Sequence, residues 1–327
     1  MMLNKISSIF PPPGFLDFPF AGLAISDSFI HCIQFGKKKD AIYIEKHIEK
    51  AIPPGLVVSG QINNKEALID MLKILKKDLN LNRVKVSLPE EKGYLFTAKI
   101  PRATQKEIRS AIESKIEENV PVSPNELLFD YNLIDRSQPD YMIVSVSTSS
   151  VSLIDLYVEI FEKAELSLIS LEIESQAIAR SLLPKGRDDG LDTVLIVNYG
   201  LEKVGLYVVV DRVVYFTSTV SIKGEPSKDS EFLSREIKKL YIYWHTLKQN
   251  AGKPKKKIKK IIVCGENFKD EIVSYLSANN QVPAVLGNAW ANVLDIGKDI
   301  PEISFVDSLR YVTSIGLALP SSVLTQK

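Results

Sequence analysis

The sequence predicts an α/β fold of two lobes. Its length of 327 residues suggests about two domains and is enough for a large core. Residues 198–222 have the pattern of a buried strand, a glycine turn, a second strand, a tight turn and a third strand. Residues 22–35 repeat the beginning of this pattern, with a strand, a small polar turn and an alternating strand. Amphipathic helices follow both segments, so we expect sheets covered by helices.

Both turns resemble the phosphate loops of actin-like ATPases, with one difference in each. In that superfamily an aspartate ends the first strand of the loop and orients the hydrated magnesium ion and the attacking water. Here Asn198 and Ala24 stand at those positions. Neither an amide nor a methyl group can replace a carboxylate in this role. Taken by itself, however, the segment 198–222 also fits a β-meander that needs glycine for its turn.

Further segments resemble the PilM group of type IV pilus assembly proteins, which are related to the division protein FtsA. They follow one another in the order of that family and cover about residues 20–320. The matching segments are residues 52–62, 84–89, 117–122, 129–131, 172–180 and 315–319. The resemblance implies an actin-like, ribonuclease H-like fold of two lobes, with a small inserted α+β subdomain of the 1C or SHS2 type and a shortened second lobe.

Local patterns fit this organisation. Asn64 is a helix cap before an amphipathic helix from Lys65 to Leu79. Residues 94–148 predict a strand, a helix from about Thr104 to Asn119 and two more strands, which is the order of an inserted subdomain. The expected division is an N-terminal arm (1–19), subdomain 1A (20–93 and 149–184), subdomain 1C (94–148), subdomain 2A (190–224 and 258–320) and a reduced subdomain 2B (225–257).

The second lobe is short at the place where PilM relatives hold adenosine. In those relatives a glycine, here in Lys223-Gly224, precedes a long helical subdomain. This chain has one predicted helix, about Lys228 to Gln249, before a strand over residues 258–264. The resemblance therefore implies a pseudo-ATPase without a cofactor, although ATP with magnesium stays an alternative. The degenerate nucleotide loops comprise Ala24, Ser26, Asp27, Ser28, Asn198, Tyr199, Gly200, Gly265 and Glu266.

Composition and charge exclude several classes of function. With 41 basic and 40 acidic residues, the net charge of +1 gives no support for general nucleic-acid binding. The two cysteines, Cys32 and Cys264, lie in apolar runs and are expected to be buried thiols. The three histidines lack metal-ligand spacing, so no metal site is expected. No apolar stretch reaches the roughly 18 residues of a membrane span and the signal-peptide pattern is missing, so a cytoplasmic protein is predicted.

The resemblance implies a scaffold of the type IV pilus assembly platform at the cytoplasmic face of the inner membrane. Family members bind the N-terminal tail of the membrane protein PilN in a groove between 1A and 1C, which needs no chemistry. The resemblance also implies an indirect association with the membrane, with self-association as a further expectation. The candidate groove residues, which equally fit the core of the 1C subdomain, are Phe96, Ile112, Ile116, Phe129 and Tyr131.

Two other functions stay open. A weakly active ATPase requires Asp27, three residues after the missing acid, to supply the carboxylate. A division scaffold similar to FtsA requires a C-terminal amphipathic helix, and residues 316–327 are short and interrupted by Pro320. The lysine-rich run at residues 253–260 fits a solvated linker, although such a run also attracts the phosphate groups of lipid or nucleic acid.

Overall fold

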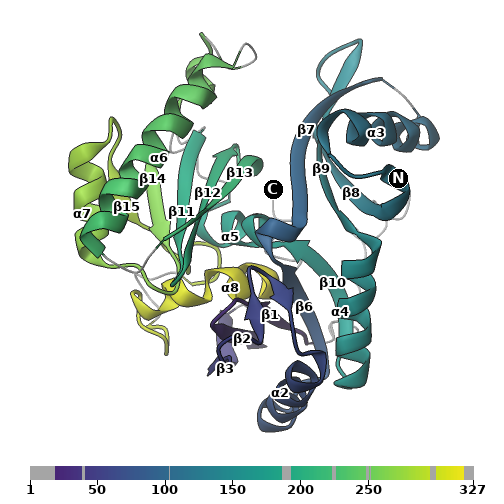
Figure 1. Cartoon of the computed structure of the whole chain (residues 1–327), viewed down its shortest axis with the longest axis vertical. Coiled ribbons are helices and arrows are strands. Elements are labelled where there is room, and N and C mark those ends of the chain that lie inside the picture. The colour runs from purple at the N-terminus through teal and green to yellow at the C-terminus, as the bar shows by residue number, and fades with distance from the viewer. Residues whose placement is uncertain are drawn as a thin grey trace.

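The computed structural model describes residues 19–38, 41–102, 104–185, 193–222, 226–247, 250, 252–294 and 300–319. All of the expected N-terminal arm except residue 19, most of the expected boundary between the lobes at 184–190, the glycine of Lys223-Gly224 and the C-terminal residues 320–327 lie outside this part. Two five-stranded sheets form the two lobes, and a smaller three-stranded sheet stands above the first lobe (Figure 1). Among the described residues, no helix is long and apolar enough to cross a bilayer.

The first sheet has the strand order β10-β6-β1-β2-β3. Antiparallel pairing joins β1, β2 and β3, whereas β6 and β10 are parallel to β1. Helices α2 (Lys65–Leu79) and α4 (Val151–Lys163) pack on its outer face. The predicted cap is confirmed, because Asn64 Oδ1 accepts a hydrogen bond of 3.0 Å from the Ala67 amide. The strands are β1 (Ala21–Ile25), β2 (Phe29–Lys38), β3 (Ala41–Ala51), β6 (Arg83–Leu88) and β10 (Ser167–Ile173).

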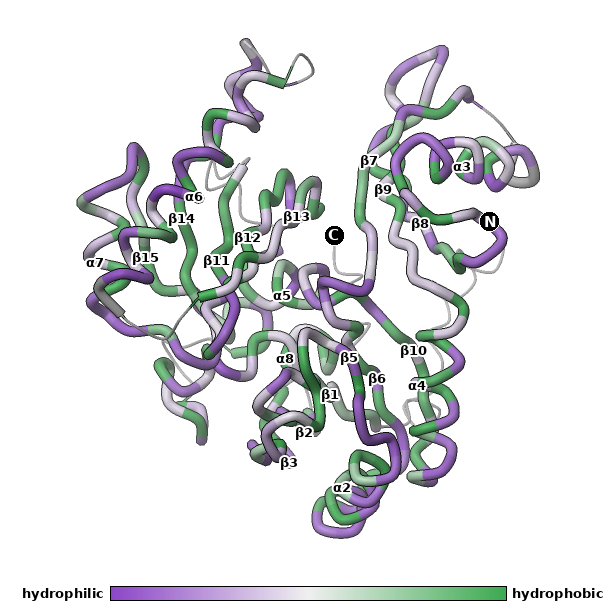
Figure 2. The backbone as a smooth tube through the Cα atoms, in the orientation of Figure 1, coloured by the Kyte–Doolittle hydropathy of each residue, from purple (hydrophilic) through white to green (hydrophobic). Residues whose placement is uncertain are grey.

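The second sheet repeats this connectivity in the order β13-β12-β11-β14-β15. Three antiparallel strands come first in the chain, and two strands parallel to β11 follow after helices. Helices α6 (Pro226–Thr246) and α7 (Asp270–Asn279) cover the outer face. Figure 2 shows hydrophobic residues concentrated in these strands, as a sheet covered on both faces requires. The strands are β11 (Thr193–Tyr199), β12 (Lys203–Val210), β13 (Val213–Ser221), β14 (Ile261–Cys264) and β15 (Ala284–Leu286).

Two helices lie between the sheets and join the lobes into one core (Figure 1). They are α5 (Glu174–Leu182) and α8 (Val312–Ala318), the latter preceded by the 3₁₀ turn η5 (Asp307–Tyr311). Their crossing depends on Gly316, where a Cβ atom would lie 1.9 Å from the Ala177 carbonyl oxygen. The helices can therefore approach each other only because residue 316 has no side chain.

The insertion forms an antiparallel sheet in the order β7-β9-β8, covered on one face by α3. Its two ends lie side by side, because Tyr94 pairs with Thr148 at the base of β7 and β9. The predicted helix is confirmed, and Thr104 begins it with a capping box to Glu107. The elements are β7 (Gly93–Pro101), α3 (Gln105–Asn119), the 3₁₀ turn η3 (Pro124–Glu126), β8 (Leu127–Asp135) and β9 (Tyr141–Ser150).

Four short elements complete the described chain. They are the hairpin β4 (Val57–Val58) and β5 (Gln61–Ile62), and the 3₁₀ turns η2 (Glu90–Lys92) and η4 (Pro254–Lys256). Turn η2 leads from the first sheet into the insertion, and it lies against β13 of the second lobe. This position makes η2 a contact point of all three sheets.

Candidate functional site

The two degenerate loops meet in the cleft between the lobes. Ala24 and Ser26 of the first loop face Asn198 and Gly200 of the second across a narrow cavity of about 50 Å³. Gly265 and Glu266, at the end of β14, also line this cavity, whereas Asp27, Ser28 and Tyr199 are not among its lining residues. The structure therefore brings six of the nine predicted loop residues to one place.

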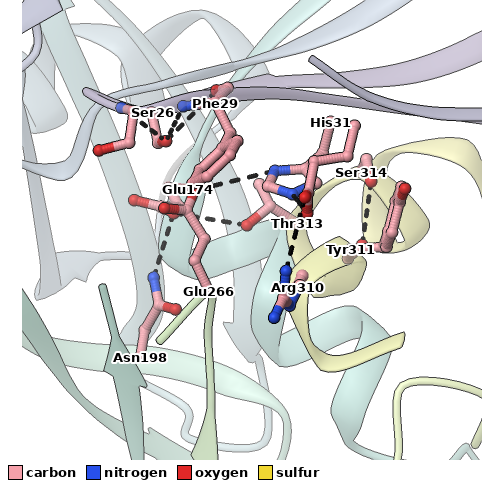
Figure 3. Close-up of polar contacts among 12 residues, drawn as sticks. Ser26, Phe29, His31, Glu174, Asn198, Glu266, Arg310, Tyr311, Thr313 and Ser314 are labelled. Carbon is pink, nitrogen blue, oxygen red and sulfur yellow. Dashed lines mark hydrogen bonds and ion pairs between the residues drawn. The ribbon is translucent and has the colours of Figure 1, made fainter. Parts of the chain in front are cut away.

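The first loop uses its own amides internally. Ser26 Oγ accepts hydrogen bonds from the Phe29 amide at 3.0 Å and from the Ser28 amide at 3.2 Å, as Figure 3 shows in part. Asp27 is equally engaged, because its two carboxylate oxygens accept from the amides of Ser59 at 3.0 Å and Gly60 at 2.9 Å. The groups that would hold phosphate or magnesium in an active relative are thus already paired.

Asn198 donates a hydrogen bond to the carboxyl group of Glu174, a residue that no sequence pattern marked by itself. Its Nδ2 donates to Glu174 Oε1 at 3.1 Å, and Thr313 Oγ1 donates to the same oxygen at 3.4 Å (Figure 3). Burial raises the pKa of Glu174, although the Lys203 charge opposes this shift. An aspartate at position 198 would face Glu174 at hydrogen-bond distance, so the amide fits this cleft and a second carboxylate does not.

Two more glutamates line the same cavity. Burial raises the pKa of Glu90 to about 7, and its carboxyl group accepts from the Ser175 amide at 3.0 Å and the Ser175 hydroxyl at 3.1 Å. Burial also raises the pKa of Glu266 to about 7. The Glu266 carboxylate lies 3.7 Å from His31 Nδ1, and burial lowers the pKa of that histidine. Three glutamates therefore line the cavity, together with His31, Lys203 and Arg310.

Lys203 links the lobes at the mouth of the cavity. Its Nζ lies 2.6 Å from Glu91 Oε1 and 3.4 Å from Asp27 Oδ2, both in the first lobe. Beyond it lies an open pocket of about 490 Å³, lined in part by Asp27, Glu91, Glu202 and Lys203. Asp27 and Glu91 pair with Lys203 and Glu202 adds a third carboxylate to the lining, so the outer pocket is acidic.

The end of β14 approaches β11 closely. Gly265 has φ of +115°, and a Cβ atom there would lie 2.5 Å from the Tyr199 backbone nitrogen and oxygen. This position requires glycine, and the Glu266 side chain that follows fills the space beside His31. Within the described ranges, no group of three or more His, Cys, Asp or Glu residues is arranged to hold a metal ion.

A second, much larger cavity lies between the first sheet and the insertion. This groove has a volume of about 620 Å³. Strand β10 lies at the edge of the first sheet and β8 at the edge of the three-stranded sheet, and both contribute to it. Its walls come from β8, β9, β10, the start of α5 and the turn between β12 and β13. The lining includes Leu128, Phe129, Asp130, Thr148, Ile154, Ser170, Glu172, Gln176, Arg180 and Arg212.

Of the five predicted groove residues, Phe129 lines this cavity. Ile112 and Ile116 are fully buried on the inner face of α3, and the prediction that they line a surface groove is corrected: they form the core of the insertion. Phe96 and Tyr131 are partly buried against the same core and are not among the groove residues. The alternative given for this set, a core of the 1C subdomain, fits these four residues.

Polar groups in the groove have unused bonding capacity. Thr148 Oγ1 and Ser170 Oγ are buried and have no hydrogen-bond partner among the described residues. The Arg180 guanidinium is paired with Glu172, whereas no ion pair or hydrogen bond joins Arg212 to any described residue. Glu172 and Arg180 belong to the matching segment 172–180, whereas no sequence pattern marked Thr148, Ser170 or Arg212 as site residues.

Sequence and structure comparisons agree on the family. A family model described as "Type IV pilus assembly protein PilM" matches residues 22–235, about two thirds of the chain. The chain belongs to the PilM family. No curated protein matches its sequence. A solved PilM–PilN type IV pilus biogenesis complex has a chain with the same fold, with a TM-score of 0.74, 15% identity and coverage of 91% of this chain and 97% of that one.

A second solved structure has a related fold. It is the cytoplasmic domain of EpsL, an inner membrane component of the type II secretion system of Vibrio cholerae. The TM-score is 0.52 at 9% identity, with coverage of 94% of this chain and 99% of the EpsL chain. This PilM family member thus has the actin-like ATPase fold, with two mixed five-stranded sheets.

Proposed function

We propose that this PilM family member is a non-catalytic scaffold of the type IV pilus assembly platform. It works at the cytoplasmic face of the inner membrane, and its groove binds the N-terminal tail of a PilN-like inner-membrane protein. The observation that carries the proposal is the contrast between the two cavities. The groove has about 620 Å³ and unused polar groups, whereas the inner part of the cleft, where the two degenerate loops meet, has about 50 Å³ and is lined by three glutamates.

The groove has the chemistry of a site for an extended peptide. Its volume falls in the range of about 300–1,000 Å³ that ligand sites usually have. The edge strands β8 and β10 carry backbone groups that a peptide strand can pair with. Thr148 and Ser170 add two hydroxyl groups that lack partners and are covered in the unbound protein. Leu128 is 47% exposed and offers an apolar contact.

The cleft supports a role without catalysis. Asn198 and Ala24 replace both magnesium-orienting acids, and Glu90, Glu174 and Glu266 line the space between the loops, where they repel phosphate whenever they are ionised. The ATPase alternative requires a free carboxylate at Asp27, but both oxygens of that group accept backbone hydrogen bonds. The inner space of about 50 Å³ is also far below the roughly 300 Å³ at which small-molecule sites begin, and the outer pocket beyond Lys203 carries three carboxylates.

Similarity to a solved complex favours the same partner class. The solved structure is a complex of PilM with PilN, and its matching chain shares the fold of 91% of this chain. A PilN-like tail is therefore the first peptide to test. Because the groove is formed between the first sheet and the insertion, binding depends on both of these parts.

The test is a binding assay with synthetic N-terminal tails of single-span membrane proteins encoded near this gene. We expect one tail to bind the full chain by fluorescence anisotropy. The variant Leu128→Asp, in the groove, should lower the affinity at least tenfold. Leu133→Asp is the matched control, because Leu133 lies on the same strand, is 41% exposed and is not a groove residue.

Circular dichroism and thermal unfolding establish that both variants are folded. Equal loss of affinity in the two variants would show that the effect is not specific to the groove. If no tail binds the intact chain, the proposed partner is wrong. Calorimetric titration with ATP and magnesium on the same protein tests the proposal of a non-catalytic role separately.

A further inference from the structure

A basic surface lies on the outside of the second lobe, and neither cavity includes it. From Ile237 to Gly265 the sequence contains nine lysines and neither aspartate nor glutamate. This segment covers the second half of α6, turn η4 and strand β14. Figure 1 shows the C-terminal part of α6 rising beyond the end of the second sheet. Most of the lysine side chains in this segment are exposed to solvent.

The lysine run is held in a defined conformation. Trp244 Nε1 donates to the Lys256 carbonyl oxygen at 2.6 Å, and the Ile258 amide donates to His245 Nε2 at 3.2 Å. Lys256 turns inward, with Nζ 3.7 Å from the centre of the Tyr215 ring, and burial lowers its pKa to about 8. The lysines that remain exposed alternate along the run and are Lys253, Lys255, Lys257 and Lys259.

Helix α6 adds an exposed apolar pair next to these lysines. Ile242 is 63% exposed and Tyr243 is 49% exposed, one turn after the exposed Lys238 and Lys239. Lys238 and Ile242 line one small pocket together with Ile258, which places the exposed Ile242 near the lysine run, and the Tyr243 ring lies 5.4 Å from the ring of Phe216 on β13. The next residue, Trp244, holds the lysine run against this end of the helix. We name the lysine surface the set Lys238, Lys239, Ile242, Tyr243, Lys253, Lys255, Lys257 and Lys259.

Carboxylates near this surface are few. Glu236 pairs with Lys239 at 2.7 Å, and Asp211 acts electrostatically on the inward-facing Lys256. By contrast, the exposed face of α2 mixes Lys73 and Lys77 with Asp70 and Asp78. The whole chain carries a net charge of only +1, so the lysine surface is a local concentration of charge and not part of a uniformly basic protein.

We propose that the lysine surface binds the anionic headgroups of a lipid bilayer. Lysines flanking exposed aliphatic and aromatic side chains are the combination that lies at a membrane interface, because the cations attract phosphate while the apolar groups enter the headgroup region. Nucleic acid would use the lysines but leaves Ile242 without a role. This contact would hold the protein at the membrane directly, independently of any peptide in the groove.

The test uses the full chain and vesicles that contain no protein. Vesicles with 30% phosphatidylglycerol in phosphatidylcholine are compared with pure phosphatidylcholine vesicles in a flotation assay at 0.1 M salt. We expect binding to the anionic vesicles and loss of binding at 0.5 M salt. Each lysine contributes about fivefold to partitioning, so the triple variant K253Q/K255Q/K257Q should bind about 100-fold more weakly.

Two further variants test whether the position of the lysines matters and whether the apolar side chains contribute. The control K50Q/K73Q/K77Q removes three exposed lysines elsewhere and should retain binding. The variant Ile242→Ser with Tyr243→Ser should weaken binding while leaving the charge unchanged. Equal loss in the lysine variant and its control, or equal binding to neutral vesicles, overturns the proposal. So does binding of a 20-nucleotide RNA without vesicle binding. Peptide binding in the groove does not enter any of these outcomes.

Discussion

The ionisation of Glu90 tests whether the cleft is as buried as described, because the Glu90 carboxyl group lies at the contact of the three sheets. Burial raises its pKa from the usual 4.5 to about 7. The folded protein therefore keeps a proton on Glu90 up to about pH 7, whereas the unfolded chain loses that proton near pH 4.5. Between these values the unfolded state binds fewer protons, so the free energy of unfolding falls as the pH rises.

The variant Glu90→Gln resembles the protonated side chain and does not titrate. The difference of about 2.5 pKa units corresponds to about 3 kcal/mol. Relative to the natural protein, the variant should be nearly neutral below pH 4.5 and more stable by up to about 3 kcal/mol above pH 7. Glu266 titrates in both proteins, so its contribution cancels in the comparison.

Urea unfolding followed by circular dichroism at several pH values between 4.5 and 8 measures this difference. Glu159→Gln is the matched control. Hydrogen bonds from Lys163 and Lys65 lower the pKa of Glu159 to about 2, so its effect should be constant over the same range. A stability difference for Glu90→Gln that does not change with pH would refute the reasoning, since it would mean that Glu90 is ionised in the folded protein.

Three other outcomes follow from the structure. ATP with magnesium should give no measurable heat of binding, and Ala24→Asp combined with Asn198→Asp should not create turnover, because the acidic lining stays; efficient hydrolysis by that variant would contradict the proposed loss of catalysis. Gly316→Ala should destabilise the protein by about 2 kcal/mol or more in urea unfolding, because its methyl group collides with a backbone carbonyl of α5. Thr148→Val should raise the free energy of unfolding by about 1 kcal/mol, since it removes a buried hydroxyl without a partner. The same variant should weaken binding of the tail peptide. A stable variant with unchanged affinity would exclude this hydroxyl from the peptide contact.

Local sequence patterns predicted most of the elements. The helix Lys65–Leu79 and its Asn64 cap are as expected, because capping and amphipathic spacing depend on neighbouring residues. The strand, helix, strand, strand order of the insertion is also confirmed. Helices α7 and α8 were not assigned from the sequence. Helix α8 is short and buried on all sides, so it has no amphipathic pattern to recognise.

The sequence by itself also located the two loops that meet in the cleft, since strand and turn chemistry is local and the missing acids at Ala24 and Asn198 are visible as residue types. Only the tertiary structure decided what surrounds them. Glu90 and Glu174 come from separate elements, and their burial and shifted pKa values arise where the lobes pack together. The groove is likewise a product of packing, because it exists only where the insertion, the edge of the first sheet and the turn between β12 and β13 meet. Burial, charge coupling and unpaired hydroxyl groups depend on contacts between distant residues, and a linear pattern contains no information about which of those contacts form.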